Sequence, residues 1–163
     1  MTAPSHLLIY EFDPGARFEG QLVGALERIQ ALGQSRLLDG LFAAHDPDTG
    51  ELAAIDLRAS RGADAVAGFL SFRLDPDARR QATEATMSDS GSVPASVARD
   101  IAGAVKPGGA MLVLLMQRPD WHVLGDAVAR TGGSLLRAEP VSSSSLADAE
   151  PQLLAALGSS HES

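Results

Sequence analysis

Short apolar runs alternate along the chain with segments whose apolar residues recur every three or four positions. An apolar run of about four to eight residues between turn-forming residues is typical of a buried β-strand. The sequence therefore predicts strands at 6–12, 110–117 and 134–141, and a β-hairpin over 36–59 that turns at "DPDTG". The run "AMLVLLMQ" has no polar alternation, which predicts a strand buried on both faces.

Helical spacing of apolar residues predicts helices at 13–33, 93–109, 119–133 and 145–158, and a short one near 63–73. Asp13 is the expected cap of the first helix and Ser145 that of the last, because a side-chain oxygen there can accept a free N–H of the first turn. In the middle of the chain, we expect a break at Asp75-Pro76 and a mobile polar segment around 84–92.

The order strand, helix, strand occurs twice, at 6–45 and at 110–141, with a glycine at the end of each helix. Two such split β-α-β units predict an α+β fold of ferredoxin-like character, in which helices pack on one face of a single sheet. A chain of 163 residues fits one domain with its own hydrophobic core. We expect this single domain to span 1–158 and residues 159–163 to form a frayed tail.

Composition narrows the class of protein. The longest uninterrupted apolar run, Ala110 to Met116, is far shorter than the roughly 20 residues that cross a bilayer. The first residues, "MTAPSHLLIYEFD", lack the basic region of a secretory signal. The sequence has no cysteine, so it offers neither a disulfide framework nor a thiolate nucleophile. These observations predict a cytoplasmic protein that does not bind membranes.

The net charge of −8 argues against nucleic acid as a partner. A surface that binds a duplex needs clustered Lys and Arg, whereas the 13 basic residues here are scattered and only Arg79 and Arg80 adjoin. We expect instead a homodimer that covers an exposed apolar sheet face, and a different protein partner is the open alternative.

Two motifs resemble cofactor or metal sites, and the sequence favours a turn at each. "VKPGG" occurs late in many methyltransferase domains, but the first strand here lacks the following glycine-rich turn that such a cofactor needs. "DPDTG" begins like a calcium loop, yet the twelfth position counted from Asp46 is Leu57 instead of an acid. We therefore expect no cofactor and no metal, with Pro107 ending a helix and Gly108 and Gly109 turning the chain.

One junction combines residue types that could bind a ligand. In "MQRPDWHVLGD", a buried strand meets a helix N-terminus, where free backbone N–H groups favour anions. Arg118, Trp121 and His122 could line a small pocket there. The alternative is that Trp121 packs on the domain while His122 points elsewhere, and no second His stands three or four positions away to complete a metal site. No G-x-S-x-G elbow or paired carboxylates indicate a catalytic residue.

The stretch "FDPGARFEGQLVGALERIQALGQSRLLDGLFAAHDPDTGELAAIDL" resembles a chiefly actinobacterial protein family of unknown function, and so do the later "AMLVLLMQ" and "DAVARTGGSLLRA". Distantly similar, stress-associated predicted membrane proteins carry a Gly-rich apolar insertion, for which "AVAGFLSF" is too short here. Family members often place Glu-His shortly before a Trp, where this chain has Gln117 and Arg118. The resemblance implies no reaction, cofactor or catalytic residue.

We expect a non-catalytic small interaction or regulatory protein, with a link to stress that only the resemblance implies. The alternative is a small-molecule-binding protein or a cofactor-independent enzyme, with its pocket near Arg118, Trp121 and His122. A concave apolar pocket with converging polar groups would favour this alternative, and a flat apolar patch would favour the interaction protein.

Overall fold

The computed structural model describes residues 5–13, 36–45, 52–56, 75–87, 95–106, 108–117, 121–142 and 145–161. In chain order, the elements of this described part are β1 (Ser5–Phe12), β2 (Arg36–His45), β3 (Leu52–Asp56), α3 (Pro76–Met87), α4 (Ala95–Ala104), β4 (Ala110–Gln117), α5 (Trp121–Thr131), β5 (Gly133–Val141) and α6 (Glu150–His161). The fold is α+β, which confirms the predicted class.

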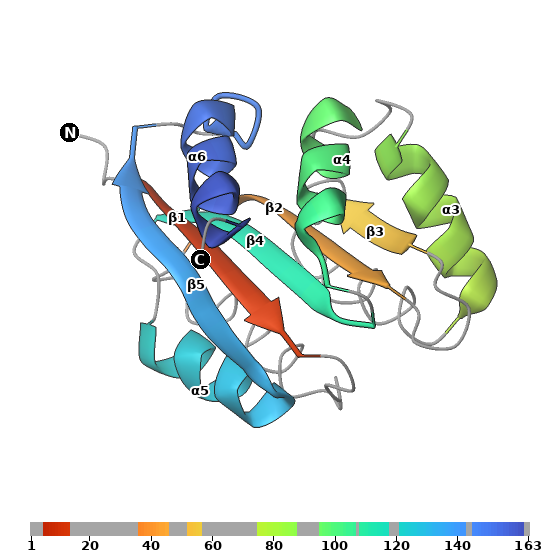
Figure 1. Cartoon of the computed structure of the whole chain (residues 1–163), viewed down its shortest axis with the longest axis horizontal. Coiled ribbons are helices and arrows are strands. Elements are labelled where there is room, and N and C mark those ends of the chain that lie inside the picture. The colour runs from red at the N-terminus through yellow and green to blue at the C-terminus, as the bar shows by residue number, and fades with distance from the viewer. Residues whose placement is uncertain are drawn as a thin grey trace.

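The strands form one antiparallel sheet in the order β3-β2-β4-β1-β5 (Figure 1). β4 lies in the middle of the sheet, with β1 paired to one side of it and β2 to the other. Every residue of β4 except Gln117 is buried. The prediction of a strand covered on both faces is therefore confirmed.

Helices cover both faces of the sheet, with α4 and α6 on one side and α5 on the other (Figure 1). One hydrophobic core joins Leu7 and Ile9 of β1 to α4 and α6. The other joins Leu8 and Tyr10, the intervening residues of the same strand, to α5. The predicted packing of helices on one face is wrong, and so is the predicted exposed sheet face. Consecutive residues of β1 and β4 are apolar, so both faces have to be buried.

The strand order does not confirm the predicted ferredoxin-like arrangement. β2 and β3 form the predicted hairpin, and β3 extends the sheet beyond β2 as an edge strand. The sheet therefore has a fifth strand that the two predicted β-α-β units do not contain. The other predicted strands are confirmed as β1, β4 and β5.

The helices agree with the prediction in part. α4 and α5 lie within the predicted ranges, whereas α6 begins at Glu150 and continues through His161 into the predicted tail. Ser145 caps the turn that leads into α6, because its hydroxyl accepts the N–H of Asp148 at 3.2 Å. Apart from Asp13, the predicted helices at 13–33 and 63–73 lie outside the described residues.

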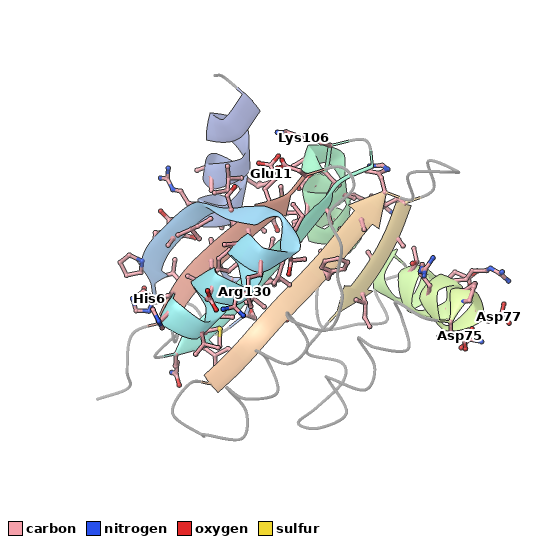
Figure 2. The ribbon with its side chains drawn as sticks, turned by 90° about the horizontal axis from the view of Figure 1, so that it is seen from below. His6, Glu11, Asp75, Asp77, Lys106 and Arg130 are labelled. Atoms are coloured by element: carbon pink, nitrogen blue, oxygen red, sulfur yellow. The ribbon has the colours of Figure 1, made fainter. Side chains whose placement is uncertain are left out.

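α3 corrects the prediction for the middle of the chain. Pro76 is the first residue of this helix, and the Oδ1 atom of Asp75 accepts the N–H of Asp77 at 3.0 Å. Figure 2 shows both aspartates at this end of α3. The Asp-Pro pair therefore starts a helix that the sequence analysis did not predict, and the segment that the predicted break would end lies outside the described residues. The helix continues to Met87, so the first part of the predicted mobile segment at 84–92 is helical.

The predicted glycine turn between α4 and β4 is confirmed. Gly108 has a φ of 76°, a conformation that glycine adopts without steric cost. The N–H of Gly109 donates to the carbonyl oxygen of Lys106 at 2.8 Å. A Cβ atom on Gly109 would lie 2.8 Å from the carbonyl oxygen of Phe12, so only glycine fits this close approach to β1.

Candidate functional site

An open surface cavity of about 540 Å³ lies between the β2–β3 hairpin and the helices α3 and α4. Among the described residues, it is lined by His45, Leu52, Thr83, Arg99, Ala102 and Gly103. Figure 1 shows these elements side by side at the β3 end of the sheet. The volume lies within the range of about 300–1,000 Å³ that is usual for small-molecule sites.

Thr83 fixes the α3 wall of the cavity to the sheet. Its hydroxyl oxygen accepts the backbone N–H of Ala54 at 3.1 Å and donates to the carbonyl oxygen of Arg79 at 2.7 Å. Ala54 belongs to β3, the edge strand, whose outward N–H would otherwise lack a neighbouring strand. The same bond therefore satisfies the sheet edge and holds α3 beside it.

His45 lines the cavity from a position beside the glycine turn. It is the last residue of β2, lies opposite Leu52 in the hairpin, and is half-buried. Its backbone N–H donates to the carbonyl oxygen of Gly109 at 3.0 Å. The imidazole is therefore carried by a backbone position that is fixed both by the hairpin and by the start of β4.

α4 supplies the remaining wall through residues on one side of the helix. Arg99, Ala102 and Gly103 are spaced by three and four positions, so they lie on one helix face. Val97 and Ile101 belong to the hydrophobic core between α4 and the sheet. A Cβ atom on Gly103 would meet nothing within 4 Å, so the missing side chain leaves space at the cavity.

The chemistry of the lining suits an anion with an apolar body. Arg99 offers the planar donor fork that matches a carboxylate, and His45 adds an imidazole from the opposite element. Leu52, Ala102 and Gly103 contribute nonpolar surface. No carboxylate occurs among the described lining residues, although the chain carries 21 acidic residues.

The cavity does not involve the residues that the sequence singled out. Arg118 lies outside the described residues, and the side chain of Trp121, the first residue of α5, does as well. His122 is exposed in the first turn of α5. Because α5 packs on the sheet face opposite α4, the predicted pocket and the observed cavity are different places.

Sequence reasoning missed His45 and Arg99 because 54 positions separate them and neither belongs to a known motif. The sequence contained only a weak indication of this site. Arg99 and Gly103 are four apart on a helix whose apolar residues already define the opposite face. That spacing marks the exposed side of α4, but only the packing of α4 beside β2 brings His45 to it.

Lys106 is the only lysine of the chain and forms an ion pair at the end of β1. Its Nζ atom lies 3.0 Å from Oε1 of Glu11, and Figure 2 shows the two side chains together. The hydrogen bond with Glu11 and the charge of that residue raise the pKa of Lys106. The amine therefore keeps its proton and ties the glycine turn to β1, which is a structural role.

Comparison with known proteins does not assign the cavity. None of the protein-family models, curated proteins or solved structures with which the chain was compared matches it. In the described ranges, no cluster of three or more His, Asp or Glu side chains could hold a metal ion. No helix of the same ranges is long and apolar enough to cross a membrane.

Proposed function

We propose that the protein is a non-catalytic binding protein for a small carboxylate with an apolar body, and that this ligand occupies the cavity between α3, α4 and the β2–β3 hairpin. One observation carries the proposal. Arg99 and His45, from elements distant in sequence, line the same cavity of about 540 Å³ together with nonpolar residues. A few polar groups that converge on an apolar hollow are typical of a small-molecule site.

The size and charge of the lining support this class of ligand. A guanidinium group binds a carboxylate through two parallel hydrogen bonds, which are stronger than bonds between neutral groups. Leu52 and Ala102 would contact the nonpolar part of the ligand. The protein as a whole is acidic, so a carboxylate would be repelled from most of its surface and attracted at this place.

We infer binding instead of catalysis from the use of the polar groups. The hydroxyl of Thr83 donates to the carbonyl oxygen of Arg79 and accepts the N–H of Ala54, so it is committed to structure. A nucleophile needs an adjacent base within hydrogen-bond distance. Thr83 carries the one side-chain hydroxyl among the described lining residues, and its proton is already donated to a backbone carbonyl oxygen.

Three broader proposals accompany this one. The sheet is a ferredoxin-like variant, supported by β1 lying between β4 and β5, which run in the same direction and are joined through α5. The protein is cytoplasmic, supported by the absence of cysteine from its sequence. It belongs to the actinobacterial family that its sequence resembles, and its role there is regulatory.

The first test compares benzoate with benzamide, which share an aromatic ring but differ in charge. We expect benzoate to bind and benzamide to bind much more weakly, as measured by saturation-transfer NMR on the full chain. Arg99→Gln should weaken benzoate binding about tenfold, the effect of losing one charge-assisted hydrogen bond. Arg130→Gln is the matched control, because Arg130 lies on α5 and pairs with Asp126 there (Figure 2). Equal binding of the two probes would contradict the proposal.

A second pair of variants tests the position of the site. Gly103→Leu places a side chain in the space beside the cavity and should abolish benzoate binding. Gly125→Leu is the control, since Gly125 is also helical and a Cβ there would also meet nothing within 4 Å, but it lies on α5. Unchanged binding to the Gly103 variant, with the fold intact by circular dichroism, would place the ligand elsewhere.

A further inference from the structure

The two ends of the sheet differ in how their edges are covered. At one end, α3 lies beside β3 and Thr83 accepts the outward N–H of Ala54. At the other end, β5 pairs with β1, and within the described ranges no strand pairs with its second edge (Figure 1). An open edge of this kind presents unpaired N–H and C=O groups that can pair with another chain.

β5 is more exposed than β1 and β4, the other strands of this sheet with complete burial patterns. It has nine residues. The exposed ones are Ser134, Leu135, Arg137, Ala138 and Pro140. Leu135 is 48% exposed, and Leu154 of the neighbouring helix α6 is 40% exposed. These are the exposed large hydrophobic residues of the described part of the chain, and both lie on elements at this end of the sheet.

The position of Pro140 indicates which backbone groups face the open edge. In an antiparallel ladder, alternate residues direct both backbone groups to one neighbour, and the residues between them direct theirs away. Proline cannot donate an N–H, so in an edge strand it takes a position directed away from the neighbour. Pro140 lies opposite His6 of β1. The backbone groups of Ala138, two residues earlier, are therefore also directed outward.

The charged residues on either side of Ala138 favour one register for antiparallel pairing of β5 with the β5 strand of a second copy. Arg137 and Glu139 lie opposite Ile9 and Leu7, so both are on the sheet face that α6 covers. Their side chains already approach within the strand, with Nη2 and Oε2 3.6 Å apart. A two-fold axis at Arg137 would oppose two arginines, and an axis at Glu139 would oppose two carboxylates. An axis at Ala138 opposes each arginine with a glutamate, which is the favourable pairing.

We propose that two copies of this chain form a dimer by antiparallel pairing of their β5 strands, with the two Ala138 residues opposite each other on the two-fold axis. The two Ala138 residues exchange backbone hydrogen bonds. Arg137 of each copy pairs with Glu139 of the other. The contact is self-complementary, as an interface between identical copies must be, and it joins the two sheets into one. It uses no residue of the cavity, so it stands independently of the proposed ligand.

The decisive experiment mixes two single charge variants. We expect the wild-type protein to be a dimer at micromolar concentration by light scattering and native mass spectrometry. Arg137→Glu opposes only carboxylates across the axis, and Glu139→Arg opposes only arginines, so each variant alone should be monomeric. Their mixture should form a one-to-one heterodimer. The charge pair within each strand is lost in both variants, so recovery on mixing reports contact between copies.

Backbone pairing is tested by a proline substitution. Ala138→Pro removes the outward N–H but none that bonds to β1, so the variant should keep its circular dichroism spectrum and become a monomer. Ala138→Thr keeps the N–H and should remain a dimer. A wild-type monomer, or a dimer that persists in Ala138→Pro and in both charge variants, would overturn the proposal.

Discussion

The carboxylate of Asp39 accepts the backbone N–H of Leu146 at 2.9 Å, although 107 residues separate the two in sequence. Asp39 is fully buried, and its second oxygen accepts the N–H of Gly40, also at 2.9 Å. It lies where β2 shifts its register against β4. One side chain therefore ties the turn before α6 to a strand near the centre of the sheet.

Asp39→Asn should destabilise the protein by about 2–3 kcal/mol, because an amide offers only one acceptor oxygen to the two backbone N–H groups and turns its NH₂ toward the other. Urea denaturation followed by circular dichroism measures this loss. Asp126→Asn is the control, since Asp126 forms an exposed ion pair with Arg130 at 3.3 Å and should change the stability by less than about 1 kcal/mol. An unchanged urea midpoint for Asp39→Asn would mean that the buried carboxylate adds nothing to stability.

Asp75→Ala should weaken the start of α3 and cost about 1 kcal/mol, because the N–H of Asp77 loses its acceptor. Hydrogen exchange gives a more specific readout. The N–H of Ala54 depends on Thr83 of the same helix, so it should exchange faster in the variant. Asp75→Ser preserves a capping oxygen and should restore the slower exchange; equal exchange in Asp75→Ala and in the wild-type protein would argue against the cap.

Gly133→Ala should destabilise the protein by about 1–3 kcal/mol through overpacking. The new Cβ would lie 2.5 Å from Cδ1 of Phe12 and 2.9 Å from Cγ1 of Val128, and the Phe12 ring is fully buried. Gly125→Ala, at an open helical position, should instead stabilise the protein by about 0.5–1 kcal/mol. Thermal unfolding of the two variants should therefore shift in opposite directions. Stabilisation by Gly133→Ala would show that the Phe12 ring moves aside freely.

Tyr10 should make the protein sensitive to alkali. It is the only tyrosine, and burial raises its pKa from 10.0 to about 12. The unfolded chain therefore loses this proton at a lower pH than the folded one, so the stability contributed by Tyr10 is present below pH 10 and is lost as the pH rises toward 12. Phenolate absorbance should titrate with a midpoint near 12 in the folded protein.

Tyr10→Phe is the control for this titration, and it should remove the tyrosine part of the alkaline loss of stability. A remainder is expected from Lys106, whose pKa is raised by Glu11 and whose ion pair is also lost as the pH rises. A phenolate midpoint near the ordinary value of 10 would show that Tyr10 is accessible to solvent in the folded state.

β1 and β4 were predictable because their apolar residues are contiguous. "AMLVLLMQ" has no polar position, and both faces of β4 are buried. α3 was not predictable in the same way. Its sequence, "PDARRQATEATM", has no apolar stripe, and it is held by a cap and a bond from Thr83 to the sheet edge. A helix stabilised in that way leaves little periodic signal.

The placement of helices on both faces of the sheet could not be predicted from the sequence, and neither could the cavity, because both depend on tertiary packing. Leu7 and Leu8 are consecutive and both apolar, which indicates that β1 is buried on both faces. The sequence does not show which helix covers each face. His45 and Arg99 are unremarkable in sequence and meet only through the placement of α4 beside the hairpin. The sequence predicted a pocket near Trp121 and His122 instead, because Trp and His are rare residue types in this chain and both lie at the start of a helix.

The hydrogen bond from His45 to Gly109 has a consequence for how such a protein could change over evolution. The chain leaves the centre of the sheet at His45 and returns at Ala110, and the bond of 3.0 Å joins the two ends of this excursion. Every described residue that lines the cavity lies between these two points or at the first of them. The segment between β2 and β4 therefore begins and ends at neighbouring positions of the sheet. Because α4 belongs to the hydrophobic core, changes in length or sequence are accommodated in the other parts of the excursion, so ligand preference can diverge while the strands remain as they are.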